Sequence, residues 1–91
     1  MIQMFGNTYS LIDNNKDGWD PGAFEGRYSD ILDKYDYIVG DWGYKQLRLN
    51  GFYNNNKQSV PEEMKIKAIE EYLVEYCNFG CAYFVLEKLN K

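Results

Sequence analysis

An aromatic-rich stretch in the middle of the chain carries charged side chains of both signs. Asp36, Asp41 and Arg48 lie within it, and Trp42 and Tyr44 stand between the second acid and the arginine. Two carboxylates and a guanidinium beside aromatic rings could bind a polar ligand or a peptide in a cleft. The same residue types also form ordinary cross-strand charge pairs, with acids that accept hydrogen bonds in turns. The second interpretation is favoured, but these five residues are the first candidates for a binding site.

The segment DNNKDG is similar to the start of a calcium-binding loop. Asp13, Asn15 and Asp17 stand at the first three ligand positions. Gly18 would provide the bend, but the closing bidentate acid should fall at Phe24. Without that carboxylate the loop lacks its strongest ligand. We therefore interpret the segment as a solvated turn and predict no metal site.

Two cysteines, Cys77 and Cys81, are separated by three residues. Redox pairs and structural zinc sites usually have two intervening residues, and the chain has no histidine to complete a zinc site. A reversible disulfide across the join between a helix and a strand is one alternative. The favoured interpretation is two reduced thiols buried among neighbouring aromatic residues.

The segment FGCAYFV is similar in part to the aromatic strand of RNA-recognition motifs. Gly80, Ala82 and Tyr83 fit that pattern, whereas Cys81 replaces an aromatic residue. A platform on which bases stack also needs positive charge around it. We therefore expect Tyr83 and Phe84 to be core residues on the two faces of a buried strand.

Composition disfavours several classes of protein. The chain has 91 residues, a formal net charge of −4 and no histidine. Net acidity disfavours binding to nucleic acid, and the absence of histidine removes the commonest general base and zinc ligand. There is no phosphate-binding loop or nucleophile elbow, so we predict neither an enzyme nor a cofactor. No apolar run approaches the ~20 residues that span a bilayer, and no signal peptide is visible, so we expect a cytoplasmic protein with no membrane association.

Local patterns predict the element order β-β-α-β-β-α-β in a single domain, residues 1–91. The expected elements are strands at 2–5 and 8–12, a helix at about 21–34, strands at 35–41 and 45–53, a helix between Ser59 and Asn78, and a strand at 81–86. The fold class is α+β, with a small, twisted, mostly antiparallel sheet of about five strands and two helices packed against it. The last strand is apolar at every position, which predicts a central place in the sheet. It can pair in parallel with an interior strand through a right-handed crossover.

Both expected helices carry start signals. Asp20 is a plausible N-cap, and Pro21 would occupy the first helical position. Ser59 and Glu62 have the spacing of a capping box, in which each side chain satisfies a backbone N–H of the other residue.

Three segments, YDYIVGDWGY, QLRLNGFY and EYCNFGCAYFVL, together resemble the YutD-like family, small proteins of low-GC Gram-positive bacteria. The resemblance extends from about Tyr9 to Leu86. It implies a compact α+β domain in the cytoplasm, and it implies no established activity, cofactor or catalytic residue. Many members have a longer, charged C-terminal tail, so any function of such a tail is expected to be missing from a chain that stops at Lys91.

The number of aromatic residues is large for so small a chain: nine tyrosines, five phenylalanines and two tryptophans. A small interior cannot hold all these rings, and exposed tyrosine and tryptophan are favoured at interfaces. We therefore predict a non-catalytic regulatory or adaptor module that binds a protein partner through exposed aromatic residues. One alternative is a nucleic-acid-associated regulator. Another is a small ligand-binding or enzymatic domain that uses Asp36, Asp41 and Arg48. Neither the partner nor the oligomeric state follows from the sequence.

Overall fold

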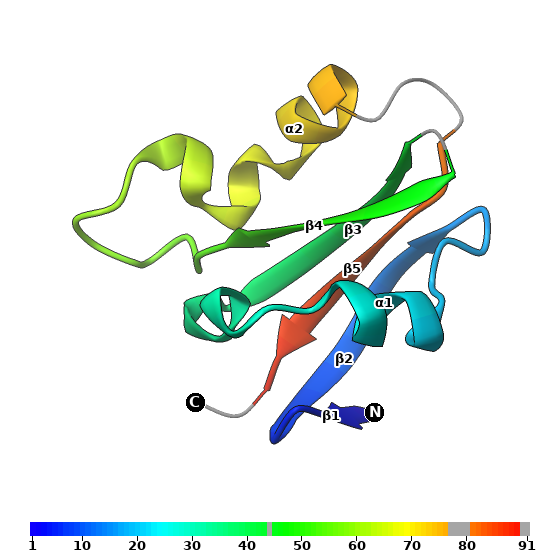
Figure 1. Ribbon diagram of the computed structural model, residues 1–91. Coiled ribbons are helices and arrows are strands. Elements are labelled where there is room, and N and C mark those ends of the chain that lie inside the picture. The colour runs from blue at the N-terminus through cyan, green and yellow to red at the C-terminus, as the bar shows by residue number, and fades with distance from the viewer. Residues whose placement is uncertain (44, 77–80, 90–91) are drawn as a thin grey trace.

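The computed structural model describes residues 1–43, 45–76 and 81–89, which form one antiparallel sheet with helices on both faces (Figure 1). The strands are β1 (Ile2–Met4), β2 (Asn7–Asn15), β3 (Tyr37–Gly43), β4 (Gln46–Phe52) and β5 (Tyr83–Lys88). The helices are α1 (Pro21–Arg27) and α2 (Ile69–Tyr76), with shorter 3-10 helices η1 (Asp30–Lys34), η2 (Glu62–Met64) and η3 (Ile66–Ala68). This arrangement confirms the predicted α+β class and the order of strands and helices.

The last strand, β5, lies in the middle of the sheet, whose order is β1-β2-β5-β3-β4. Phe84, Val85 and Leu86 are all buried, because both faces of this strand are covered. The expected parallel pairing is wrong, since β5 is antiparallel to both of its neighbours, β2 and β3. β3 is also antiparallel to β4, so β4 and β5 run in the same direction. The crossover through α2 therefore skips one strand.

The two faces of the sheet have separate cores. On the α1 face, Phe24 packs with Phe84 and Leu86 of β5 and with Ile38 of β3. On the other face, Ile69, Tyr72 and Leu73 of α2 pack against a smaller cluster. That cluster consists of Val39, Phe52 and Val85, which alternate in the strands with residues of the first core. The result is a three-layer arrangement of helix, sheet and helix.

The predicted helix at 21–34 is shorter than expected. Its start is confirmed, because Asp20 Oδ1 accepts a hydrogen bond of 3.1 Å from the Ala23 N–H and Pro21 is the first helical residue. α1 ends at Arg27, Tyr28 adopts an extended backbone, and η1 follows. Two glycines among seven helical residues weaken the helix. The Tyr28 ring stacks on Phe5, with ring centroids 3.9 Å apart.

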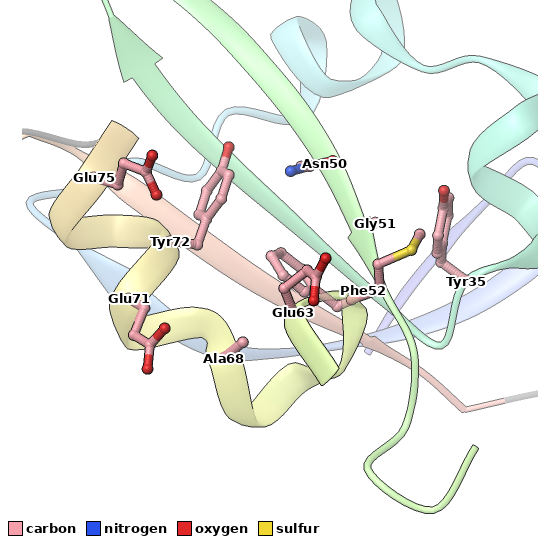
Figure 2. A pocket seen from close by; sticks show the side chains of 10 residues that line it. Tyr35, Asn50, Gly51, Phe52, Glu63, Ala68, Glu71, Tyr72 and Glu75 are labelled. Carbon is pink, nitrogen blue, oxygen red and sulfur yellow. The ribbon is translucent and has the colours of Figure 1, made fainter. Parts of the chain in front are cut away.

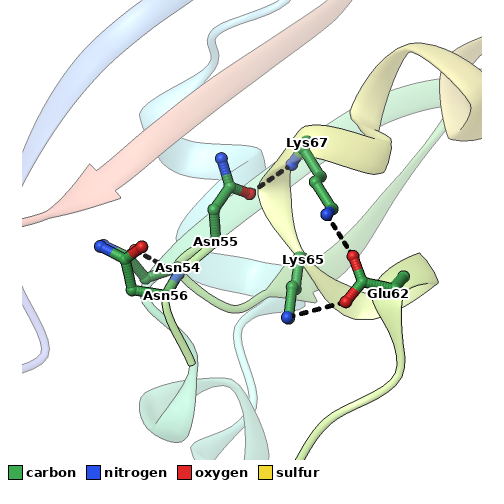
Figure 3. A network of polar contacts seen from close by, with 6 residues as sticks. All are labelled: Asn54, Asn55, Asn56, Glu62, Lys65 and Lys67. Carbon is green, nitrogen blue, oxygen red and sulfur yellow. Dashed lines mark hydrogen bonds and ion pairs between the residues drawn. The ribbon is translucent and has the colours of Figure 1, made fainter. Parts of the chain in front are cut away.

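The predicted capping box before the second helix is wrong. Ser59 has a φ of +66°, and η2 begins after Pro61 with no side-chain cap. Glu62 instead forms ion pairs with Lys65, at 2.9 Å, and with Lys67 (Figure 3). The Lys67 N–H donates a 2.8 Å hydrogen bond to Asn55 Oδ1, so the loop that precedes the helical segment supplies a polar contact to its start.

Candidate functional site

Asp41 is the centre of a polar network that joins three elements. It lies in β3 directly opposite Arg48 in β4 and is 0% exposed. Its Oδ2 accepts hydrogen bonds from Arg48 Nε at 3.0 Å and from Arg48 Nη2 at 2.5 Å. Its Oδ1 accepts a 2.8 Å hydrogen bond from the Tyr72 hydroxyl of α2. The network therefore fixes α2 to the sheet at a buried charge.

The environment of Tyr72 keeps its hydroxyl protonated. Burial and the hydrogen bond to the Asp41 carboxylate raise the pKa of Tyr72 well above its ordinary value. The hydroxyl is consequently a fixed donor toward Asp41. The local sequence pattern does not show which strand residue Tyr72 would meet.

Of the four proposed site residues that the structure describes, two are brought together, Asp41 and Arg48. Asp36 precedes β3, and its Oδ2 accepts a 2.8 Å hydrogen bond from the Asn54 N–H. Trp42 packs with the α1-face core, and its Nε1–H donates a 2.8 Å hydrogen bond to the Gly18 carbonyl. Tyr44 lies outside the described residues. Asp41 and Arg48 thus have the geometry of a cross-strand ion pair, whereas Asp36 contacts the loop that follows β4.

A groove with a cavity volume of about 430 Å³ lies between β4 and the segment that contains η2, η3 and α2 (Figure 2). Asn50, Gly51 and Phe52 of β4 line it on the sheet side. Tyr72 of α2 and Tyr35, which precedes β3, border it on opposite sides (Figure 2). The Tyr72 ring meets Phe52 edge-on, with ring centroids 5.4 Å apart. The Asp41 network thus positions one wall of this groove.

Three glutamates line the same groove. Glu63 comes from η2, and Glu71 and Glu75 lie one turn apart on α2 (Figure 2). All three side chains are exposed, and no lysine or arginine lines the groove within the described part of the chain. None of the three forms an ion pair with another described residue. The groove is therefore locally acidic.

The neighbouring Glu62 differs because it is paired. Hydrogen bonds from Lys67 and then from Lys65 lower the pKa of Glu62 to about 2. These two lysines are engaged by Glu62 on the surface of η2 and η3 (Figure 3). Both lysines therefore form their ion pairs with Glu62, and neither forms one with the three glutamates that line the groove.

The aromatic residues that were expected at the surface are partly covered. Among the described side chains, Phe5 is the one exposed ring, and the tyrosines and tryptophans are buried or half-buried. Both faces of the sheet are covered, so most rings find a place in one of two cores. Several rings contribute an edge to the surface, as Tyr35 and Tyr72 do in the groove. The aromatic contribution to the surface therefore comes mainly from half-buried rings, two of which line the groove.

The remaining sequence motifs have structural partners. Asp13 Oδ2 accepts a 3.1 Å hydrogen bond from the Tyr83 hydroxyl, and Asn15 Nδ2 donates to the Cys81 carbonyl. Asp17 lies in the turn that follows β2, with a φ of +55°. The expectation of a reduced thiol is wrong for Cys81, which is disulfide-bonded. Cys77, the other cysteine of the sequence, lies outside the described residues.

The fold is that of a small α+β protein, and the chain belongs to the YutD-like family. The family described as "Putative antitoxin YutD-like" matches residues 3–87. The chain is 56% identical over 91 residues to "Putative antitoxin YutD" of Bacillus subtilis (strain 168), with 100% of both chains covered. It is also similar to the solution NMR structure of protein yutD from B. subtilis, with a TM-score of 0.83 and 56% identity over 100% of this chain and 83% of that chain.

These comparisons confirm the resemblance drawn from the three aromatic-rich segments. The family is named for an antitoxin and not for an enzymatic activity. Within the described residues, no helix has the length and apolar character required to cross a bilayer.

Proposed function

We propose that this chain is a cytoplasmic, non-catalytic regulatory module that binds a protein partner at the groove beside β4. The observation that carries the proposal is the groove, which has half-buried rings on its walls and carboxylates at its rim. Concave sites of this kind, with apolar walls and a few polar groups, are the usual places for specific binding. The family name supports a protein partner, because an antitoxin counteracts a toxin and direct binding is one way to do so.

The charged network supports a non-catalytic role. Asp41 is buried and already accepts three hydrogen bonds, so it is poorly placed to exchange a proton with a ligand. In this proposal Asp41 and Arg48 position Tyr72 in the wall of the groove. Asp36 and Trp42 have structural contacts elsewhere and do not contribute.

The test is affinity capture from cell extract with a variant that fills the groove. Ala68 lines the groove, so Ala68→Trp should obstruct it. Gly26→Trp is the matched control, because it adds the same side chain on the other face of the sheet, where an added Cβ would meet no atom within 4 Å. Both variants are first checked for folding by their melting temperatures.

We expect the wild type and Gly26→Trp to retain the same protein, in amounts that nuclease treatment does not change. Ala68→Trp should retain at least about tenfold less, because the groove is no longer open. Equal retention by Ala68→Trp would refute binding at the groove. Loss of all retention after nuclease treatment would favour a nucleic-acid-associated regulator.

A further inference from the structure

The groove opens at an outer edge of the sheet. Within the described residues, β4 is the last strand of the sheet, and β3 is the one strand with which it pairs. The Trp42 N–H bonds to the Ala82 carbonyl, so even-numbered residues of β3 direct their backbone groups toward β5. By alternation, odd-numbered residues of β3 bond to even-numbered residues of β4. The backbone groups of Leu49 and Gly51 in β4 therefore point to the outer edge.

The chain itself already places one extended residue, Lys65, between the helices η2 and η3 and against this edge. Tyr53, the next outward-facing residue, donates its N–H to the Met64 carbonyl at 2.7 Å. Its carbonyl accepts from the Ile66 N–H at 2.8 Å, which gives a parallel bridge to Lys65. Gly51, two residues before Tyr53, is the preceding residue whose backbone faces this edge. It is buried under the Tyr35 ring and also lines the groove. The groove is thus the continuation of an edge that accepts extended backbone.

The charge of the groove selects the kind of segment that fits. Glu63, Glu71 and Glu75 line its helical side, and no cationic side chain lines it in the described part of the chain. An acidic segment, or a second copy of this chain presenting the same carboxylates, would meet like charge. A lysine or arginine side chain would meet three carboxylates, and its charge could also lie against the Tyr72 ring. The Tyr35 ring already has a cation of this chain over it, because Lys34 Nζ lies 5.3 Å from its centroid.

We infer that the groove binds an extended, basic segment of the partner protein, with lysine or arginine side chains between α2 and the edge of β4. This inference rests on the proposed function, because it specifies the chemistry of the partner at the same groove. Extended segments that bind along a sheet edge are a common mode of peptide recognition. Here the carboxylates of η2 and α2 provide the specificity for positive charge.

The experiment uses the full chain and two synthetic peptides of alternating composition, one of lysine and valine and one of glutamate and valine. Binding is followed by NMR titration and by fluorescence of the protein. We expect the lysine peptide alone to bind, with chemical-shift changes at Leu49, Gly51 and Ala68. Its affinity should fall as salt increases, because the carboxylates are exposed and screened.

Two double variants with the same net charge separate local from overall charge. Glu71→Gln with Glu75→Gln removes two groove carboxylates and should weaken binding of the lysine peptide by about tenfold. Glu25→Gln with Glu70→Gln removes two exposed carboxylates that do not line the groove, and should leave the affinity within about twofold of the wild type.

Three outcomes would overturn the inference. The first is equal weakening in both double variants, which would indicate a response to net charge alone. The second is shift changes at Leu49 and Gly51 that depend on protein concentration without peptide, which would indicate pairing of two copies of this chain. The third is unchanged capture of the cellular partner by Glu71→Gln with Glu75→Gln while Ala68→Trp abolishes it. That third result would leave the proposed function intact and refute a basic partner segment.

Discussion

Asp41 is fully buried, and three hydrogen bonds to its carboxylate offset the cost of removing that group from water. Two come from the Arg48 guanidinium and one from the Tyr72 hydroxyl. Half of the Arg48 side-chain surface remains exposed, so the arginine is only partly removed from water. Pairs of this kind are costly to break, because the remaining partner is left with an unmatched charge.

Replacing either partner should therefore destabilise the fold. We expect Arg48→Ala to lower the free energy of unfolding by roughly 3 kcal/mol, because it leaves the Asp41 carboxylate buried with one hydrogen-bond donor. Asp41→Asn should cost about 1–3 kcal/mol, because it removes the charge that Arg48 faces. Urea denaturation measures both, and the double variant should lose less than the sum.

Glu62→Gln is the control for that experiment, because Glu62 is an exposed partner of two lysines and its loss should change stability little. A small effect of both Arg48→Ala and Asp41→Asn would contradict the structural interpretation. It would instead direct attention to the pair as a binding site for a polar ligand.

Strand packing depends on glycines that admit aromatic rings. Gly40 of β3 pairs with Phe84 of the central strand, and a Cβ on Gly40 would lie 2.2 Å from Phe84 Cζ. The Phe84 ring also contacts Trp19 and Phe24, so it has little freedom to move. The absence of a side chain at Gly40 therefore permits the core of the α1 face to close over β3.

Gly40→Ala should lower the free energy of unfolding by about 1–3 kcal/mol, since the added methyl group overpacks a buried ring. Gly26→Ala makes the same change in α1, where an added Cβ meets no atom within 4 Å. It should raise stability by roughly 0.5–1 kcal/mol, because alanine favours a helix more than glycine does. Thermal or urea unfolding of both variants gives the comparison, and equal effects would show that Gly40 is not closely packed.

The identity and order of the elements were predictable because their signals are local. Asp20 and Pro21 mark the start of α1, and the apolar run at 81–86 predicts a central strand. The end of the first helix was not predictable to the same degree, since Tyr28 leaves the helix where its ring stacks on Phe5 in a distant turn. The capping box at Ser59 failed because backbone geometry at that residue differs from a cap.

The half-buried tyrosines give the molecule as a whole a dependence on alkaline pH. The pKa values of four of them are raised, in each case first by burial: Tyr28, Tyr37, Tyr72 and Tyr83. A hydrogen bond to a carboxylate raises the pKa further in three of them. Tyr37 donates to Glu87, Tyr72 donates to Asp41, and Tyr83 donates to Asp13. The folded chain thus holds these phenolic protons more tightly than the unfolded chain does.

A raised pKa in the folded state means that the stabilisation is complete below the ordinary phenol pKa of about 10 and is lost as pH rises above it. We expect the free energy of unfolding to decline above about pH 10, where the unfolded chain ionises first. Tyr72→Phe should make that decline shallower while lowering stability at neutral pH, where its hydroxyl donates to Asp41. Urea denaturation at a series of pH values measures both effects. An unchanged slope in the variant would mean that Tyr72 does not contribute.

Local patterns in the sequence were sufficient for the fold class, the order of elements, the family and the pairing of Arg48 with an acid across the hairpin, because each depends on residues close together in the chain. The neighbours of β5, the contact of Tyr72 with Asp41 and the acidic groove depend on segments that are far apart in sequence. The Tyr72 and Asp41 side chains, for example, are 31 residues apart. Only chain closure and the packing of two helical layers on one sheet bring such groups together, and no local pattern encodes which distant residues will meet.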